Sequence, residues 1–256
     1  MNGIAARSIT TPLGGRAVAL GVVLLILLTG CSGGPDPQGA APASSPAQAR
    51  ESVVAAEPLR EARKGWKMFA DPNRLLSFEL PAAWVVQPVK VESGEYSPNS
   101  LHYAVRTADG DLVAELHTGI IRKFPDCAQE KSVPYTVIAS SPTELVTAAD
   151  STNTIEPRFV VRLMQGFTFF SSYGITDQVG GADGRACVLT NTVQGPEKVG
   201  RFSFGDAEAV APKSPADTGP GTLTFPTIAK AEKHFDSQQF RTVQQMIRSL
   251  RLSGQQ

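Results

Sequence analysis

Three cysteines are the first residues whose type can do chemistry: Cys31, Cys127 and Cys187. Zinc sites bring cysteines together in close pairs such as CxxC, with further cysteine or histidine ligands nearby. Neither Cys127 nor Cys187 has such a neighbour in the sequence. We therefore expect these two to form one disulfide in an oxidising compartment. It would close a loop of about 60 residues, which contributes roughly 4 kcal/mol in the chain-entropy model. Two free thiols, or two metal-binding thiols, are the alternatives.

Imidazoles are the second candidates, and the chain has three histidines: His102, His117 and His234. His102 and His117 lie on either side of Asp109-Gly110, a dipeptide typical of hairpin turns, so we expect them on facing strands. There the two imidazoles, with Glu115 or Asp111, have the ligand types for a transition metal. The chain has no HExxH or other spaced ligand motif. A packing or surface role is therefore the stronger expectation, and we expect no metal site.

Nucleophilic catalysis needs a serine or cysteine beside a base. The chain contains no Gly-x-Ser-x-Gly elbow and no SxxK set. Ser171 and Ser172 lie in an apolar stretch, where we expect them to fill space. The glycines of 180–184 lack the Lys-Ser/Thr partner of a phosphate loop and precede a strand-like segment, so we expect a plain turn. We expect no catalytic site and no cofactor.

An aromatic run is the remaining candidate for a binding surface. Its members are Phe167, Phe169, Phe170 and Tyr173. In a strand, Phe167 and Phe169 share one face, whereas Phe170 points to the other. We expect these rings to be core. The alternative is that one face is open and forms a ligand or partner surface.

Alternating and apolar runs predict the elements that would position these residues. The strand-like runs include 76–80, 101–107, 112–121, 159–164, 166–175 and 199–204. We expect the two runs at 159–175 to be one strand path with a bulge near Gly166. Near the end of the chain, Phe240, Val243, Ile247 and Leu250 recur at helical spacing. Asp236 is expected to cap this helix, with Gln239 in the capping-box position.

These elements predict an α+β domain, in which a largely antiparallel β-sheet is packed by helices, including a C-terminal helix. Its expected range is 65–254. Before it, residues 31–64 are rich in Ala, Pro, Gly and Ser and predict a flexible tether, because such a segment buries too little apolar surface to offset its ordering entropy.

The first 30 residues carry Arg7 and Arg16, no acidic residue, and an apolar run at 17–28. That run is shorter than the roughly 20 residues of a membrane-spanning helix, so residues 1–30 predict a signal peptide. The following Leu28-Thr29-Gly30-Cys31 resembles the lipobox of bacterial lipoproteins. The resemblance implies cleavage before Cys31 and a diacylglycerol on its thiol, which would hold the protein on the extracytoplasmic face of the cell membrane. An ordinary secretory peptide with an incidental cysteine is the alternative.

Charge argues against nucleic acid as a partner. The chain has 24 basic and 24 acidic residues, and removal of 1–30 takes away two arginines and no acid, which leaves 22 against 24. A near-neutral protein has no general electrostatic basis for binding nucleic acid.

Both ends of the expected domain resemble one family. The sequence FADP at 69–72 precedes LSFELPAAW at 76–84, and a helix at 240–250 ends in Ser249-Leu250. Together they are similar to the PsbP-like α/β/α sandwich, a group that includes small actinobacterial lipoproteins. The resemblance implies a non-enzymatic binding or adaptor module and carries no catalytic residues.

We therefore expect a lipid-anchored envelope protein that binds a small molecule or a partner protein without catalysis. A structural or assembly factor of an envelope complex is the alternative, and a hydrolase of envelope polymers ranks last. A deep apolar pocket would favour small-ligand binding, and a flat exposed aromatic patch would favour a protein partner.

Overall fold

The computed structural model describes residues 61–92, 94–124, 131–145, 154–218 and 222–253. All of them belong to Ala56–Gln256, the second of the two units into which the chain divides. In this described part, no helix is both long enough and apolar enough to cross a bilayer.

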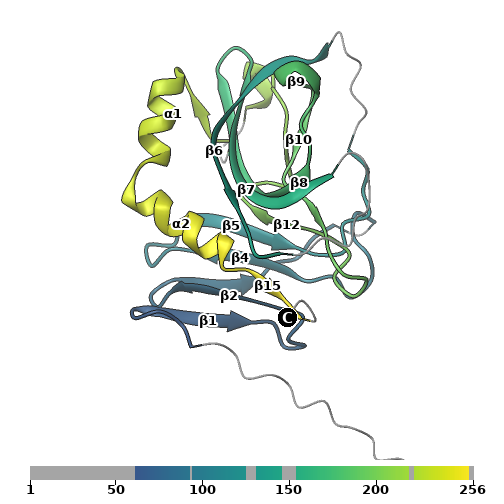
Figure 1. The fold of residues 1–256 in the computed structure, drawn as a ribbon, viewed down its shortest axis with the longest axis vertical. Helices are drawn as coiled ribbons and strands as arrows, with labels where there is room; N and C mark the ends of the chain where they lie inside the picture. Colours follow the sequence, from purple (N-terminus) through teal and green to yellow (C-terminus); the bar gives the residue numbers. More distant parts are fainter. Residues whose placement is uncertain (1–60, 93, 125–130, 146–153, 219–221, 254–256) are drawn as a thin grey trace, which may run out of the picture. The chain divides into compact units, whose positions relative to one another are not determined.

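The main sheet of this unit is antiparallel at every pairing (Figure 1). Its strands, in spatial order, are β3 (Val85–Pro88), β4 (His102–Arg106), β5 (Leu112–His117), β12 (Arg201–Gly205), β8 (Phe169–Gln178), β7 (Thr154–Gln165), β6 (Val133–Pro142) and β9 (Arg185–Ala186). Two short strands join it at the side, β11 (Val193–Gln194) on β12 and β14 (Thr224–Phe225) on β8. The α+β class expected from the sequence is confirmed at this level.

The remaining strands form two smaller sheets. The first contains β1 (Trp66–Ala70), β2 (Leu76–Pro81) and β15 (Arg251–Leu252), so it joins both ends of the described chain. The second pairs β10 (Leu189–Thr190) with β13 (Ala209–Val210). Short 3-10 turns occur at Ala182–Gly184 and Pro215–Asp217. The turn at 180–184 expected from its glycines therefore leads directly into β9.

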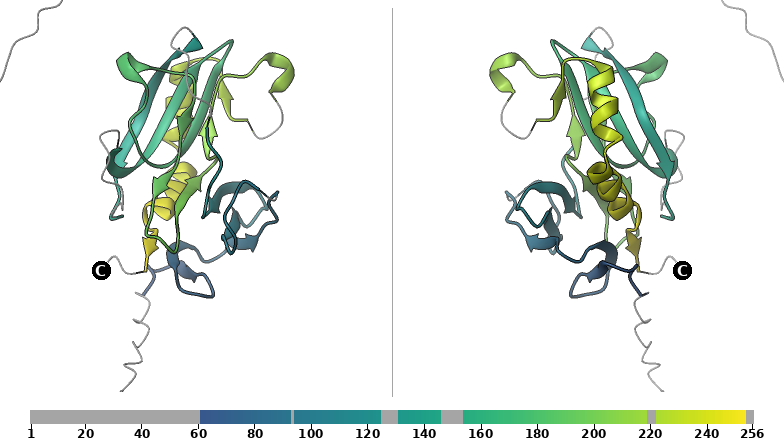
Figure 2. Two further views of the ribbon diagram at one scale, coloured as in Figure 1. Left: turned by 90° about the vertical axis from the view of Figure 1, so that its right-hand side faces the viewer. Right: turned by 90° about the vertical axis from the view of Figure 1, so that its left-hand side faces the viewer.

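Two consecutive helices, α1 (Ile228–Phe235) and α2 (Gln238–Arg248), run across one face of β7 and β8 (Figure 2). Alternation along β7 directs Phe159, Val161 and Leu163 into the core on this face, where they meet the apolar stripe of α2. That stripe is the predicted one, since Phe240, Val243, Ile247 and Leu250 are all buried.

The helix begins one residue later than the capping pattern predicts. Ser237 is extended, at φ −64° and ψ 151°, and its side chain accepts a hydrogen bond from the Phe240 backbone N–H. Asp236 has helical angles instead and ends α1. The predicted cap was wrong because a helix not expected from the sequence, α1, occupies the preceding residues.

The predicted bulge near Gly166 was also wrong. β7 ends at Gln165, β8 begins at Phe169, and the two strands pair antiparallel along their length. Gly166 lies in the turn between them, where its N–H donates to the carbonyl of Thr168. The chain reverses direction here, so that Gln165 lies opposite Phe169 at the turn and Thr154 lies opposite Gln178 at the far end.

Candidate functional site

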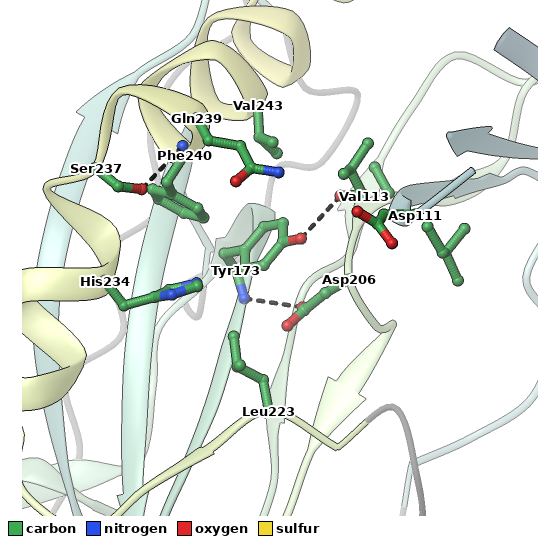
Figure 3. Close-up of a pocket in the computed structure, with 12 residues that line it drawn as sticks. Asp111, Val113, Tyr173, Asp206, Leu223, His234, Ser237, Gln239, Phe240 and Val243 are labelled. Carbon is green, nitrogen blue, oxygen red and sulfur yellow. Dashed lines mark hydrogen bonds between the residues drawn. The ribbon is translucent and has the colours of Figure 1, made fainter. Parts of the chain in front are cut away.

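A cavity of about 330 Å³ lies between the main sheet and the first turns of α2 (Figure 3). We call it the Tyr173 cavity. Its lining residues are Asp111, Leu112, Val113, Ala114, Tyr173, Asp206, Leu223, His234, Ser237, Gln239, Phe240 and Val243. The volume is at the lower end of the range for small-molecule pockets, which is about 300–1,000 Å³.

Tyr173 of β8 forms the centre of this cavity (Figure 3). Its hydroxyl donates a hydrogen bond of 2.8 Å to the carbonyl of Val113 on β5. Its ring meets the Phe240 ring edge-on, with centroids 5.0 Å apart. Burial raises the pKa of Tyr173, so the phenol stays protonated and keeps this hydrogen bond at any physiological pH. The ring is thereby held in place between the sheet and α2.

Asp206 reaches the cavity because two strands approach each other closely. Gly205, the last residue of β12, pairs with Gly174 of β8. A Cβ on Gly205 would lie 2.2 Å from the carbonyl oxygen of Tyr173, so this approach needs glycine. Directly beyond it, the Asp206 backbone N–H donates to the Tyr173 carbonyl, at 3.0 Å.

The carboxyl group of Asp206 has an unusual protonation equilibrium. Its Oδ1 accepts hydrogen bonds of 2.8 Å from the Ser172 hydroxyl and from the Tyr173 backbone N–H. Burial raises the pKa of Asp206 to about 7, although these hydrogen bonds act in the opposite direction. A carboxyl group that titrates near neutral pH in a cavity is a physical indication of a functional site.

The described lining of the cavity contains two carboxyl groups and no Lys or Arg. The two carboxyl groups belong to Asp111 and Asp206. Desolvation beside aromatic rings lowers the pKa of His234, so its imidazole is neutral at pH 7. The site therefore favours a ligand with a positive or hydrogen-bond-donating group.

Apolar and polar residues occupy different parts of the cavity. Val113, Ala114, Phe240 and Val243 are buried and provide an apolar floor. The exposed residues Asp111, His234 and Gln239 form a polar rim. This arrangement suits a molecule with an apolar body and a polar group near the opening.

The two histidines expected on facing strands do meet. His102 pairs with His117 in the β4–β5 register, and their Nδ1 atoms are 2.9 Å apart. Glu115 lies nearby, with Oε2 3.8 Å from His117 Nε2. Asp111 does not join them, since it lines the Tyr173 cavity. Among the described residues, no group of three or more His, Cys, Asp or Glu could hold a metal ion.

The serines and the aromatic run fall into distinct environments. Ser171 and Ser172 are buried, and each donates a hydrogen bond, to the Leu223 carbonyl and to Asp206 respectively. Phe170 and Tyr173 are buried, whereas Phe167 is 59% exposed and its ring lies edge-on against Phe170. The run is therefore mostly core, with one exposed ring at the turn.

Of the three cysteines predicted as sites, the structure describes only Cys187. Cys31 and Cys127 lie outside the described residues. Cys187 is disulfide-bonded, and its pairing with Cys127 stays a prediction.

Asp206 is a site residue that the sequence motifs did not indicate. Its sole signal is its place directly after Gly205 at the end of an alternating strand, which does not reveal the partner strand. Comparison with known proteins adds no assignment: no protein-family model, no curated protein and no solved structure matches this chain.

Proposed function

We propose that this protein is a lipid-anchored binding protein of the bacterial cell envelope, and that its Tyr173 cavity holds a small amphipathic cation without catalysing a reaction on it. The observation that carries the proposal is the charge of the cavity: Asp111 and Asp206 face an apolar floor with no Lys or Arg among the described lining residues. A protonated amine with an apolar body complements both features.

The proposed location rests on the sequence. The apolar run at 17–28 and Leu28-Thr29-Gly30-Cys31 support cleavage before Cys31 and a diacylglycerol on its thiol. We also propose the PsbP-like relationship, which the sequence at 69–84 and 240–250 supports.

The first experiment asks what the protein carries. The acylated protein is extracted gently from its own membranes and studied by native mass spectrometry. We expect a retained small amine, and we expect it to be lost from Val243→Trp, because the larger side chain fills the floor of the cavity. A retained anion, or equal retention by Val243→Trp, contradicts the proposal.

The second experiment tests the chemical class with a matched pair of probes. We expect phenethylammonium to bind at least tenfold more tightly than the neutral 2-phenylethanol, measured by isothermal titration calorimetry at pH 8. Because Asp206 titrates at about 7, the affinity for the cation should rise between pH 6 and pH 8. Asp206→Asn should weaken cation binding and remove this rise. Equal affinity for the two probes would refute a cation site.

The lipid anchor has its own test. Cys31→Ala removes the only thiol that the signal sequence presents for acylation, so the protein should lose its diacylglycerol and should no longer be held at the membrane as the processed form. Detergent phase partitioning and intact-mass measurement check this result, with Ser32→Ala as the control that keeps the anchor. An acylated, membrane-held Cys31→Ala protein would rule out the lipobox assignment.

A further inference from the structure

A second cavity, of about 260 Å³, lies on the other face of β5 and β12. We call it the Ser203 cavity. Along β12, Phe202 and Phe204 enter the main core, so Ser203 points to the opposite face. Ser203 pairs with His117 in the β12–β5 register, and Gly205 pairs with Glu115. The same face of the sheet thus presents the histidine, the glutamate and the serine together.

Ser203 provides an independent indication of a ligand. It is completely buried, yet its Oγ has no hydrogen-bond partner among the described residues. Buried hydroxyl groups in proteins nearly always have such a partner. Because Ser203 also lines the cavity, its hydroxyl is available to a molecule bound there.

The histidine pair supplies a second unused hydrogen-bonding group. His102 Nε2 is 2.7 Å from the Ser100 hydroxyl, and its Nδ1 is 2.9 Å from Nδ1 of His117. These contacts use Nδ1 of His117. Its other ring nitrogen, Nε2, is 3.8 Å from Glu115 Oε2, which is beyond hydrogen-bond distance. The neighbouring carboxylate favours the tautomer in which this Nε2 carries the proton. His117 then offers an N–H donor to the cavity.

The charges of the cavity are only partly balanced. Glu208 accepts hydrogen bonds from the Tyr96 hydroxyl at 2.7 Å and from Arg122 Nη2 at 2.6 Å, so its charge is neutralised. Glu115 has no such partner at hydrogen-bond distance in the described structure, and the neighbouring His117 lowers its pKa, which keeps it ionised. Asp206 also lines the cavity, but its Oδ1 accepts hydrogen bonds from the Ser172 hydroxyl and the Tyr173 backbone N–H. Among the described lining residues, Glu115 is therefore the carboxylate whose side chain accepts no hydrogen bond at normal distance.

We propose that the Ser203 cavity is a second binding site, for a small protonated amine that also carries a hydroxyl or carbonyl oxygen. The ammonium group pairs with Glu115, and the oxygen accepts hydrogen bonds from His117 Nε2–H and from the Ser203 hydroxyl. The cavity measures about 260 Å³, against about 330 Å³ for the Tyr173 cavity, so it suits a smaller molecule than the amphipathic ligand proposed there. The argument for this site does not use the proposed function, although Asp206 lines both cavities.

The test uses ethanolammonium chloride as the probe and the full chain purified in detergent. We expect saturable binding by isothermal titration calorimetry. Binding should weaken at least tenfold in Glu115→Gln and severalfold in Ser203→Ala. Ser203→Ala should keep the thermal stability of the parent, because the hydroxyl that it removes has no protein partner. Tetramethylammonium, which has no N–H donor, should not compete.

Two controls separate this site from other sources of binding. Glu144→Gln removes an exposed carboxylate paired with Arg251, at 2.6 Å, and should leave ethanolammonium binding unchanged. Asp111→Asn alters the Tyr173 cavity alone and should also leave it unchanged. The proposal is overturned if the parent shows no saturable binding, or if Glu115→Gln and Ser203→Ala bind as tightly as the parent.

Discussion

Asp206 lines both cavities and also ends a chain of buried polar groups. Its carboxyl accepts a hydrogen bond from Ser172, whose hydroxyl in turn accepts one of 2.5 Å from the Asn191 side-chain amide. The amide oxygen of Asn191 accepts one of 2.7 Å from Arg162 Nη2. Arg162 is buried, and burial lowers its pKa to about 10. The protonation state of Asp206 therefore bears on both cavities and on the interior at the same time.

The raised pKa of Asp206 predicts that the stability of the protein depends on pH. Its pKa is about 7 in the folded protein, against 3.8 for the unperturbed group, so the folded state holds the proton more tightly than the unfolded state. Stability from this group is complete below pH 3.8 and is lost as the pH rises through about 7. We expect the free energy of unfolding of the parent, minus that of Asp206→Asn, to decrease between pH 4 and pH 7.

Urea denaturation at several pH values measures this difference. His102 and His234 have lowered pKa values, so they contribute the opposite trend below about pH 6.5. Because both proteins contain these histidines, their effect cancels in the difference. A difference that stays constant across the range would show that Asp206 titrates at its ordinary value.

At the scale of elements, α2 connects the cavity to the core and to the first strands. Its N-cap, Ser237, lines the Tyr173 cavity. At its other end, the Ser249 hydroxyl accepts a hydrogen bond of 2.8 Å from the Glu79 backbone N–H of β2. Leu250 follows and is buried. The Ser-Leu pair thus holds the end of the helix against the small sheet, which sets the position of α2 over the main sheet.

The two helix caps offer a matched pair of variants. Ser237→Ala and Thr227→Ala each remove a side-chain acceptor at a helix N-terminus, which costs about 1 kcal/mol. We expect a similar loss of stability in both, measured by urea denaturation. Ser237→Ala alone should also weaken phenethylammonium binding, because Thr227 does not line the cavity. An equal effect of both variants on binding would show that Ser237 acts through stability alone.

At the scale of the whole molecule, long-range links hold together segments distant in sequence. β15 pairs with β2, which brings the end of the described chain beside its beginning. The predicted Cys127–Cys187 disulfide would add a covalent link of the same kind, and Cys187 is indeed disulfide-bonded. A link that closes a long loop acts mainly by lowering the entropy of the unfolded chain.

Cysteine variants test this link. We expect Cys187→Ala and Cys127→Ala each to lower the free energy of unfolding by roughly 4 kcal/mol. The double variant should be no less stable than either single variant, because all three lack the same bond. Denaturation with and without reductant checks the result, since reductant should destabilise the parent alone. Unequal single variants would contradict this pairing.

Local sequence determined the elements whose burial pattern is strong. The stripe of α2 could be predicted because its apolar residues recur at helical spacing and all reach the core. The meeting of His102 and His117 could be predicted because a hairpin turn sets the register of its two strands. In contrast, α1 was missed, since it has only eight residues and buries only Ala231 and Phe235.

The candidate sites were decided by tertiary structure. Asp206 meets Tyr173, and Ser203 meets His117, through the pairing of β12 with β8 and β5, strands that are far apart in sequence. Strand alternation indicates which face a side chain takes, but it does not indicate which strand lies alongside. The sequence by itself therefore determined the class of fold and the main helix, and the signal segment stays a prediction. Only the tertiary structure decided which carboxyl, imidazole and hydroxyl groups share a cavity, because those contacts depend on long-range strand pairing.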